Sequence, residues 1–264
     1  MADVKPILVQ RRGPVATVVF NRPAQRNAFN FAMYQEIHRL AVDLEADGSV
    51  RVVVFRGAGT EAFAAGADIA EFETHRSGSA QARRYAAAFE GAMDAVEALG
   101  KPTIAMIAGA CVGGGLEFAT CMDLRIAADN SRFGVPIAKL GLLVGYKEMR
   151  RLVRLVGPAV AMDLLHTARL VDAAEAHRVG LVGRVVPLAE LEGTVSGLAE
   201  EMAGLAPLVQ RWHKRILQAV LRDPALERLT PEEEALPYAC FDTADFHEGR
   251  RAFLAKRRPQ FKGE

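Results

Sequence analysis

Short apolar segments of strand length alternate with segments of helical spacing along most of this chain. The strand-like runs are residues 15–20, 51–55, 102–108 and 123–128. Between them, Met33, Ile37 and Leu44 fall on one helical face behind Asn30, a predicted N-cap, and residues 79–99 form an Ala-rich helix. Strands that alternate with helices predict an α/β fold with substantial parallel pairing.

The last part of the chain has a helical pattern only. From about Pro187 onward the spacing is helical, and one face carries Leu208, Trp212, Ile216 and Val220. Packing in the core or against another subunit explains such a stripe. We find no internal repeat and no linker in the 264 residues, so we expect a core over residues 1–190 and a helical region over residues 191–264.

The composition restricts the binding partners and the cellular compartment that we expect for this chain. The 33 basic and 32 acidic residues give a net charge of +1, which provides no bulk attraction for nucleic acid. No apolar run reaches the roughly 18 residues of a membrane helix, and the first residues lack the hydrophobic segment of a secretory signal. The three cysteines have no CxxC spacing. We therefore expect a reducing, cytoplasmic location and neither a nucleic-acid nor a membrane partner.

The segment Ile107–Glu117 is the strongest candidate for chemistry. A strand runs into Gly113-Gly114-Gly115 and then into a helix. Glycine lets a ligand approach the backbone, and a helix N-terminus presents unpaired N–H groups, which suit an oxyanion or a phosphate. Glu117 follows Gly114 by three residues, so we expect its carboxylate about one turn along. A tight packed junction is the alternative; the spacing excludes a P-loop and a GxGxxG site.

A second loop, Phe63–Ile69, has the same character. Ala65, Gly66 and Ala67 stand between a strand and a helix, and Asp68 and Ile69 follow them. Backbone N–H groups from this loop and from Gly114 can converge on one carbonyl oxygen. Taken alone the pattern is weak, because many loops are rich in alanine and glycine.

Four blocks of this sequence, in order, resemble the signatures of the crotonase (enoyl-CoA hydratase/isomerase) superfamily. They are FNRPAQRNAFN, FAAGADIAEF, KPTIAMIAGACVGGGLEFATCMDLRIAADNSRFGVP and TADFHEGRRAFLAKRRPQFKG, and they span nearly the whole chain. The resemblance implies a crotonase/ClpP-like spiral of repeated ββα units followed by C-terminal helices. It also implies a homotrimer or a dimer of trimers, with residues 191–264 as the trimerisation region.

The resemblance assigns roles to both loops. In this family two backbone amides polarise the thioester carbonyl of an acyl-CoA, and by motif position they belong to Ala67 and Gly114. Donors aimed at a developing oxyanion are worth on the order of 3 kcal/mol each. Glu117 matches the first of the two acids that hydratases use. Coenzyme A enters only as part of the thioester substrate, so we expect no separate cofactor and no metal.

The chain departs from the hydratase pattern at the second acid. The family glutamate would follow the proline of an FGxPE motif, where this chain has Ile137, which cannot exchange a proton. The glycine-rich turn of the family is also replaced, by Val144–Leu152. Tyr146 and Glu148 are therefore candidates for the missing acid. A remodelled surface loop with solvated charges is the alternative.

Other positions are assigned by the resemblance alone. The residues expected to contact substrate are Arg26, Ala28, Ala65, Asp68, Ile69, Ile137, Tyr146, Phe253 and Lys256, the last two in the site of a neighbouring subunit. For Arg26 and Lys256 a solvated surface charge is the alternative. His75 and Arg76 belong to a region that borders the acyl pocket in this family, although a solvated loop histidine is the competing interpretation. We interpret Asp123 and Cys111 as structural.

Together these observations predict an acyl-CoA enzyme of hydratase or isomerase type, with Glu117 as its acid/base. A member that decarboxylates or hydrolyses its substrate is one alternative. A non-catalytic acyl-CoA binder, which would explain Ile137, is another. No Ser-His-Asp arrangement supports the peptidase activity that also occurs on this spiral architecture.

Overall fold

The computed structural model describes residues 5–264; residues 1–4, on which part of the prediction about a secretory signal rests, lie outside the description. The strands are β1 (Ile7–Arg12), β2 (Val15–Phe20), β3 (Val52–Gly57), β4 (Ala62–Ala64), β5 (Thr103–Ile107), β6 (Ala110–Val112), β7 (Leu124–Ala128), β8 (Arg132–Gly134), β9 (Val171–Asp172) and β10 (Arg184–Val186). The α-helices are α1 (Phe31–Ala46), α2 (Phe72–His75), α3 (Ser79–Glu97), α4 (Gly114–Ala119), α5 (Tyr146–Thr167), α6 (Ala173–Arg178), α7 (Leu191–Ala203), α8 (Pro207–Arg222), α9 (Pro231–Ala239) and α10 (Ala244–Leu254).

Two sheets organise the core. The larger has the order β1-β2-β3-β5-β7-β10, in which β1 is antiparallel to β2 and the other pairs are parallel. The smaller has the order β4-β6-β8-β9, in which β4, β6 and β8 are parallel. Strands β3, β5 and β7 lie in the large sheet, and the strand that follows each of them lies in the small sheet and leads toward a helix. This arrangement confirms the predicted α/β class and the ββα spiral.

The second strand of each unit is not visible in the sequence pattern. Strands β4, β6 and β8 have three residues each, too few for a periodicity, and two residues of β4, Phe63 and Ala64, fall within the predicted loop Phe63–Ile69. Ala62 pairs with Ala110, which in turn pairs with Arg132. These strands form because neighbouring units supply their hydrogen-bond partners.

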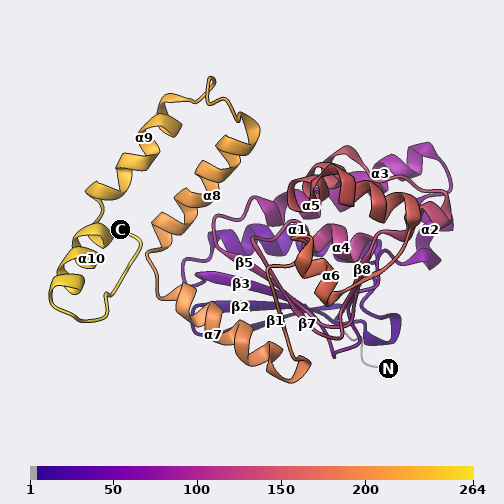
Figure 1. Ribbon diagram of the computed structural model, residues 1–264, viewed down its shortest axis with the longest axis horizontal. Coiled ribbons are helices and arrows are strands. Elements are labelled where there is room, and N and C mark those ends of the chain that lie inside the picture. Colours follow the sequence, from indigo (N-terminus) through magenta and orange to yellow (C-terminus); the bar gives the residue numbers. More distant parts are fainter. Residues whose placement is uncertain (1–4) are drawn as a thin grey trace.

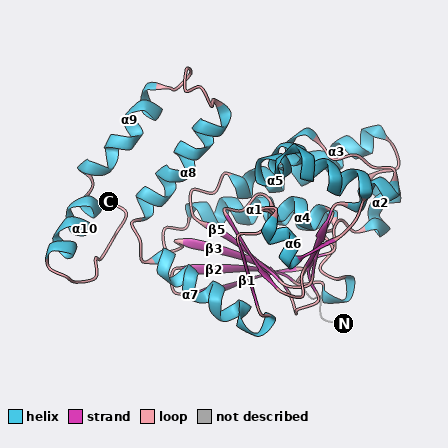
Figure 2. Cartoon of the chain, in the orientation of Figure 1, coloured by secondary structure: helices cyan, strands magenta, loops and turns pink. Residues whose placement is uncertain are grey.

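Helices cover both faces of the large sheet (Figures 1 and 2). On one side α1 packs with Met33, Ile37 and Leu44 in the main core, and the Asn30 side chain caps this helix by accepting from the Met33 nitrogen at 2.9 Å, as predicted. On the other side, α7 packs Leu191 and its apolar face against strands β2, β3, β5 and β7. The core therefore extends into the helical region.

Helices α8 to α10 project from the core as a C-terminal arm, defined here as residues 207–264 and drawn in orange and yellow in Figure 1. The arm is tied to the core where Lys214 Nζ meets Asp123 Oδ2 at 2.8 Å and where Arg51 Nη2 donates to the Phe261 carbonyl at 2.6 Å. Asp123 also accepts from the Thr103 backbone nitrogen, which agrees with its structural interpretation. The α8 stripe is only partly buried within one chain; Val220 is 40% exposed.

Across residues 5–264, no helix combines the length and the apolar character needed to cross a membrane.

Candidate active site

The glycines at the N-terminus of α4 satisfy two backbone requirements. Gly113 has a φ of 54°, in the left-handed region where L side chains are strained. A Cβ on Gly115 would lie 2.2 Å from the carbonyl oxygen of Ala64, so only glycine lets α4 pack directly on β4. The tight junction and the ligand site considered for this segment are therefore compatible. Close packing on β4 places the N-terminus of α4 beside the loop that follows β4.

Two backbone amides lie close together at this N-terminus. A Cβ built on Gly114 would lie 3.5 Å from the Ala67 nitrogen. Ala67 pairs with Phe29 in a parallel bridge, in which Phe29 N donates to Gly66 O and Asp68 N donates to Phe29 O. This pattern leaves the Ala67 N–H directed away from Phe29. Within residues 5–264 neither the Ala67 nor the Gly114 N–H has a hydrogen-bond partner, so both can serve one acceptor.

Glu117 lies in the first turn of α4, on the pocket side of the helix. Burial and, to a lesser extent, the negative charge of Glu148 raise the pKa of its carboxyl to about 7, against the opposing effect of the Arg76 guanidinium. The part of this side chain that remains accessible faces the pocket. A carboxyl with a pKa near neutrality can both accept and release a proton under ordinary conditions.

Glu148 brings a second carboxyl to the same place from the first turn of α5. It is 4% exposed, and its Oε1 atom has no hydrogen-bond partner; the nearest charge is Arg151 Nη1 at 3.6 Å. Burial raises the pKa of Glu148, while Arg151 lowers it. Glu117 and Glu148 line one pocket, and their charges interact. The pocket therefore contains two carboxyl groups rather than one.

The pocket that contains these groups has a volume of about 520 Å³. One wall comes from η2 (Ile69–Glu71), α2 and α3 and carries Phe72, Tyr85 and Phe89; another comes from residues 136–148. Such a volume, with a largely apolar lining and a few polar groups, suits a small-molecule substrate.

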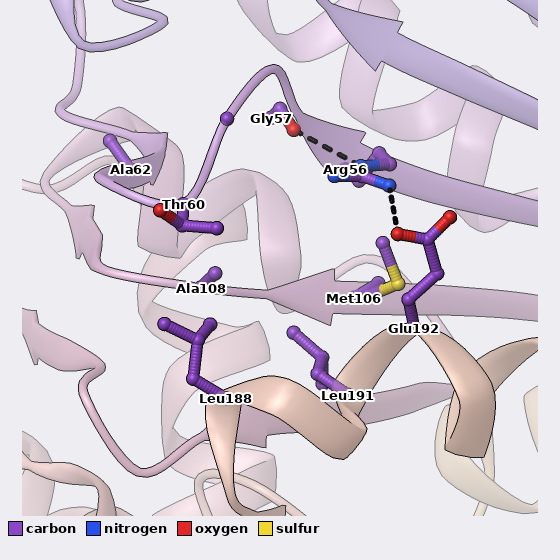
Figure 3. Close-up of a pocket in the computed structure, with 10 residues that line it drawn as sticks. Arg56, Gly57, Thr60, Ala62, Met106, Ala108, Leu188, Leu191 and Glu192 are labelled. Atoms are coloured by element: carbon purple, nitrogen blue, oxygen red, sulfur yellow. Dashed lines mark hydrogen bonds and ion pairs between the residues drawn. The ribbon is translucent and has the colours of Figure 1, made fainter.

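A smaller cavity lies between β3, β5 and α7 (Figure 3). Leu188 and Leu191 face Met106 and Ala108 across it, and Glu192 pairs with Arg56 at 3.4 Å. Its volume of about 50 Å³ holds only a few water molecules. The larger pocket is therefore the candidate active site.

Comparison with known sequences agrees with this geometry. A family profile described as enoyl-CoA hydratase/isomerase matches residues 10–264. The chain belongs to the enoyl-CoA hydratase/isomerase family. It is 38% identical over 259 residues to the probable enoyl-CoA hydratase echA8 of Mycobacterium tuberculosis and 36% identical over 255 residues to the crotonyl-CoA hydratase of Syntrophomonas wolfei, with 97% of each chain covered in both pairs. It is a hydratase-like enzyme of this family, as predicted.

Solved structures of this family have the same fold. An enoyl-CoA hydratase/carnithine racemase of Magnetospirillum magneticum matches with a TM-score of 0.95 and 42% identity, over 99% of this chain and 97% of that chain. The enoyl-CoA hydratase of Bacillus anthracis matches with a TM-score of 0.90 and 32% identity, over 98% and 100% of the two chains. The predicted crotonase superfamily is therefore confirmed.

The enoyl-CoA hydratase/isomerase fold brings several of the predicted site residues to the pocket. Ala65, Ile69 and Ile137 line it together with Ala67, Gly114 and Glu117. The Arg26 carbonyl accepts from the Ala65 nitrogen at 3.0 Å, while the Arg26 side chain is exposed. This bond places the Arg26 backbone next to the pocket wall.

Two further predicted residues have other contacts. The Ala28 carbonyl accepts from Arg22 Nη1 at 2.7 Å. The Asp68 carboxylate accepts from Arg22 Nη2 at 2.8 Å and from the Ala70 nitrogen at 3.1 Å, which caps η2. Neither residue lines the pocket. These contacts of Asp68 hold the loop in place.

Three predicted residues lie away from the pocket of their own chain. Tyr146, the first residue of α5, has a side chain that is 97% exposed and points into solvent, because the helix turns Glu148 rather than Tyr146 inward. Of the two candidates for the missing acid, the fold thus brings only Glu148 to the site. Phe253 and Lys256 belong to the C-terminal arm and are exposed.

Three residues that line the pocket were not among the predicted catalytic or substrate-binding residues. Tyr34 and Tyr85 line it from α1 and α3. Arg76 lines it with its guanidinium carbon 4.8 Å and 4.5 Å from the ring centroids of Phe72 and Tyr85. A tyrosine within an apolar or Ala-rich helical face is the sequence feature that could have indicated Tyr34 and Tyr85. His75 instead stacks on Phe31, with ring centroids 4.6 Å apart, and does not line the pocket.

Cys111 lies beside the glycines but is fully buried, and burial raises the pKa of its thiol well above the ordinary value. It therefore stays protonated, which agrees with its interpretation as a packing residue. In the part of the chain that the structure describes, no group of three or more His, Cys, Asp or Glu side chains is placed to hold a metal ion.

Proposed function

We propose that this enzyme adds water across the C2–C3 double bond of a 2-enoyl-CoA thioester. The observation that carries the proposal is the buried Glu148, which reaches the Glu117 pocket from α5 although residue 137 is isoleucine. A hydratase needs two groups that hold a water molecule and move protons, and these two carboxyls supply them from a different pair of chain positions.

The amides of Ala67 and Gly114 bind the thioester oxygen in this proposal. When the water oxygen bonds to C3, the π electrons of the double bond move toward C2 and the carbonyl oxygen, which gives an enolate. Preorganised N–H donors stabilise that charge, by roughly 3 kcal/mol each. Neither amide has a partner among residues 5–264, so no hydrogen bond of that part of the chain has to break.

Glu117 and Glu148 share the proton transfers. Burial raises both pKa values, and two neighbouring carboxylates disfavour double ionisation. In the proposed reaction the pair starts with one proton, on Glu117. Glu148, beside Arg151, takes a proton from the attacking water, and Glu117 delivers its proton to C2. Hydroxide adds to C3 and a proton to C2, and the pair keeps the same number of protons.

Isomerisation of a 3-enoyl-CoA to a 2-enoyl-CoA is the second candidate. The observation that favours it is the 3.6 Å approach of Arg151 Nη1 to Glu148 Oε1. If that contact keeps Glu148 permanently ionised, Glu117 is the one remaining proton carrier. A single carboxyl suffices to move a proton between C2 and C4.

Turnover by carboxyl variants tests these proposals. Crotonyl-CoA and 2-hexenoyl-CoA report hydration, and 3-hexenoyl-CoA reports isomerisation. General acid–base groups contribute about 10²- to 10⁴-fold, so Glu117→Gln and Glu148→Gln should each lose about that factor of hydration. Glu73→Gln, exposed on α2 and outside the pocket, is the control. If the wild-type enzyme does not hydrate 2-enoyl-CoA and Glu148→Gln still isomerises 3-hexenoyl-CoA, the second candidate is favoured. If the wild-type protein binds thioesters but turns none over, it is a non-catalytic binder.

A rescue experiment tests whether hydration requires a second carboxyl in the pocket. Ile137 lines the same pocket as Glu117 and Glu148. Ile137→Glu in the Glu148→Gln background should therefore recover part of the lost hydration. A double variant that folds, binds thioester and stays inactive would show that Glu148 acts in some way other than as an acid/base.

We also propose that the enzyme assembles as a homotrimer or a dimer of trimers through residues 191–264. In that assembly Phe253 and Lys256 contact the coenzyme A held by a neighbouring subunit, and Arg26 and Ala28 contact its nucleotide. The exposed apolar side chains of the C-terminal arm, Phe253 among them at 84% exposure, support this proposal.

A further inference from the structure

Arg76 is a cation in the pocket wall that no acidic side chain of the described residues engages. Its guanidinium lies over the rings of Phe72 and Tyr85, at 4.8 Å and 4.5 Å from their centroids. Stacking occupies the faces of a guanidinium and leaves its N–H donors at the edge. Arg151, by contrast, binds Asp94 and Glu97 at 2.6 Å and 2.7 Å. The Arg76 donors therefore remain available to a ligand.

The other charges of the pocket do not neutralise Arg76. Glu90 pairs with Lys147 at 3.3 Å, and Glu148 faces Arg151 at 3.6 Å. The remaining acid is Glu117, whose pKa of about 7 leaves it partly neutral at physiological pH. Arg83 lines the same wall and likewise forms no ion pair with a described residue. This wall thus carries uncompensated positive charge.

Two buried hydroxyl groups lie in the same wall. The side chains of Tyr34 and Tyr85 are 0% and 2% exposed, and their hydroxyls lie close to each other; within residues 5–264 neither hydroxyl has another hydrogen-bond partner. Their rings meet edge to face at 5.6 Å. A bond between the two hydroxyls would use only one of their two protons. Buried polar groups are rarely left unpaired, so these hydroxyls indicate a place where a ligand supplies the acceptor.

The hydroxyls also lie next to the site of the thioester. A Cβ built on Gly114 would lie 3.5 Å from the Tyr34 hydroxyl oxygen, the same distance as from the Ala67 nitrogen. Arg76 is close enough to Glu117 to lower the pKa of that carboxyl. The three polar groups therefore face the acyl part of a bound thioester.

We propose that Arg76, with the hydroxyls of Tyr34 and Tyr85, binds a carboxylate at the far end of the acyl group. The preferred substrates are then 2-enoyl-CoA thioesters of short dicarboxylic acids. A guanidinium fork matches a carboxylate with two parallel hydrogen bonds, and hydroxyl donors complete the shell of its oxygens. This inference rests on the proposed action on acyl-CoA and specifies its substrate class.

Calorimetry with saturated thioesters tests the recognition apart from turnover. Glutaryl-CoA and valeryl-CoA have acyl chains of equal length and differ in the terminal carboxylate. Wild-type protein should bind glutaryl-CoA more tightly, and Arg76→Gln should weaken that binding by about 10- to 100-fold, the range for a hydrogen bond to a charged group. Valeryl-CoA affinity should change little. Arg84→Gln, exposed on α3 and outside the pocket, is the matched control.

Equal affinity of wild-type protein for the two thioesters would overturn the proposal, as would an equal loss for both in Arg76→Gln. Weaker binding of free coenzyme A by Arg76→Gln would show that the anion is a phosphate and would overturn it too. Turnover of glutaconyl-CoA and 2-pentenoyl-CoA separates this inference from the hydratase proposal. Selective binding of glutaryl-CoA with no hydration of either enoyl-CoA contradicts only the hydratase proposal. Hydration of both enoyl-CoAs without selectivity contradicts only the proposed carboxylate site.

Tyr34→Phe tests the hydroxyl. Since Tyr85 is the one possible partner of this hydroxyl among residues 5–264, removal of the hydroxyl should weaken glutaryl-CoA binding and leave the thermal stability little changed. A variant with lower stability and unchanged selectivity would assign Tyr34 a purely structural role.

Discussion

Glu117 destabilises the folded chain in the pH range in which it is useful as an acid. Burial, with the charge of Glu148, raises its pKa from 4.5 to about 7, so the folded state binds this proton more strongly than the unfolded state. The stability that this bound proton gives to the folded state is therefore fully present below about pH 4.5. It is lost as the pH rises through 7 and the buried carboxyl becomes charged. The full difference is at most about 3 kcal/mol, because one pKa unit corresponds to about 1.4 kcal/mol.

Glu117→Gln should accordingly lower hydration by about 10²- to 10⁴-fold and raise the free energy of unfolding at about pH 8, by up to about 3 kcal/mol. Near pH 5 most of this gain should disappear, because wild-type Glu117 is then protonated in the folded state. Urea unfolding of both proteins at the two pH values measures the difference. A variant less stable than wild type at the higher pH would contradict the raised pKa.

Glu148→Gln should let Glu117 ionise at lower pH, since it removes the like charge that raises the Glu117 pKa. Carboxyl ¹³C chemical shifts, recorded over a pH series without substrate, report this titration. Glu73→Gln should leave the Glu117 titration unchanged. An unchanged or higher Glu117 pKa in Glu148→Gln would show that the two carboxyls are not coupled.

At the scale of the element, the N-terminus of α5 is shaped to hold a carboxyl. Gly145 is the N-cap of this helix, with a φ of −72° that alanine adopts equally well, yet a Cβ there would lie 2.2 Å from Glu148 Oε2. Gly145→Ala should therefore fold with a stability within about 1 kcal/mol of wild type. It should displace the Glu148 carboxyl and lower kcat for hydration by about tenfold or more.

Gly193→Ala is the matched control for that prediction. Gly193 lies in α7, where an added Cβ meets nothing within 4 Å, so this variant should keep full activity and gain roughly 0.5–1 kcal/mol of stability. Kinetics with crotonyl-CoA and thermal unfolding measure both variants. Full activity of Gly145→Ala would mean that the position of Glu148 does not matter for turnover.

At the scale of the whole molecule, the C-terminal arm exposes apolar side chains that a soluble monomer would normally bury. Phe253, Leu254 and Tyr238 are 84%, 75% and 71% exposed. Clustered apolar exposure of this kind marks a protein–protein interface. Phe253→Asp should therefore shift the mass measured by sedimentation from trimer toward monomer and raise KM for acyl-CoA. Lys256→Ala should raise KM at unchanged mass, and a fully active monomeric wild type would contradict the role of the arm.

The sequence by itself determined the long elements and the glycine junction. Helix α1 follows from the Asn30 cap and from apolar spacing, and the long strands follow from continuous apolar runs. Gly113 marks the start of α4 because its positive φ is a property of one residue in the chain. The order of the four motif blocks along the chain was specific enough to predict the family.

Only the tertiary structure decided what the site contains. The three-residue strands β4, β6 and β8 exist through pairing between units, and that pairing brings the Ala67 and Gly114 amides together. Glu148 stands in a segment that reads as a charged surface loop, yet it is buried because α5 turns it toward Glu117. Arg76 with its tyrosine neighbours likewise meets the pocket through packing of α1 against α3. Such contacts join residues far apart in the chain, and no local pattern encodes them.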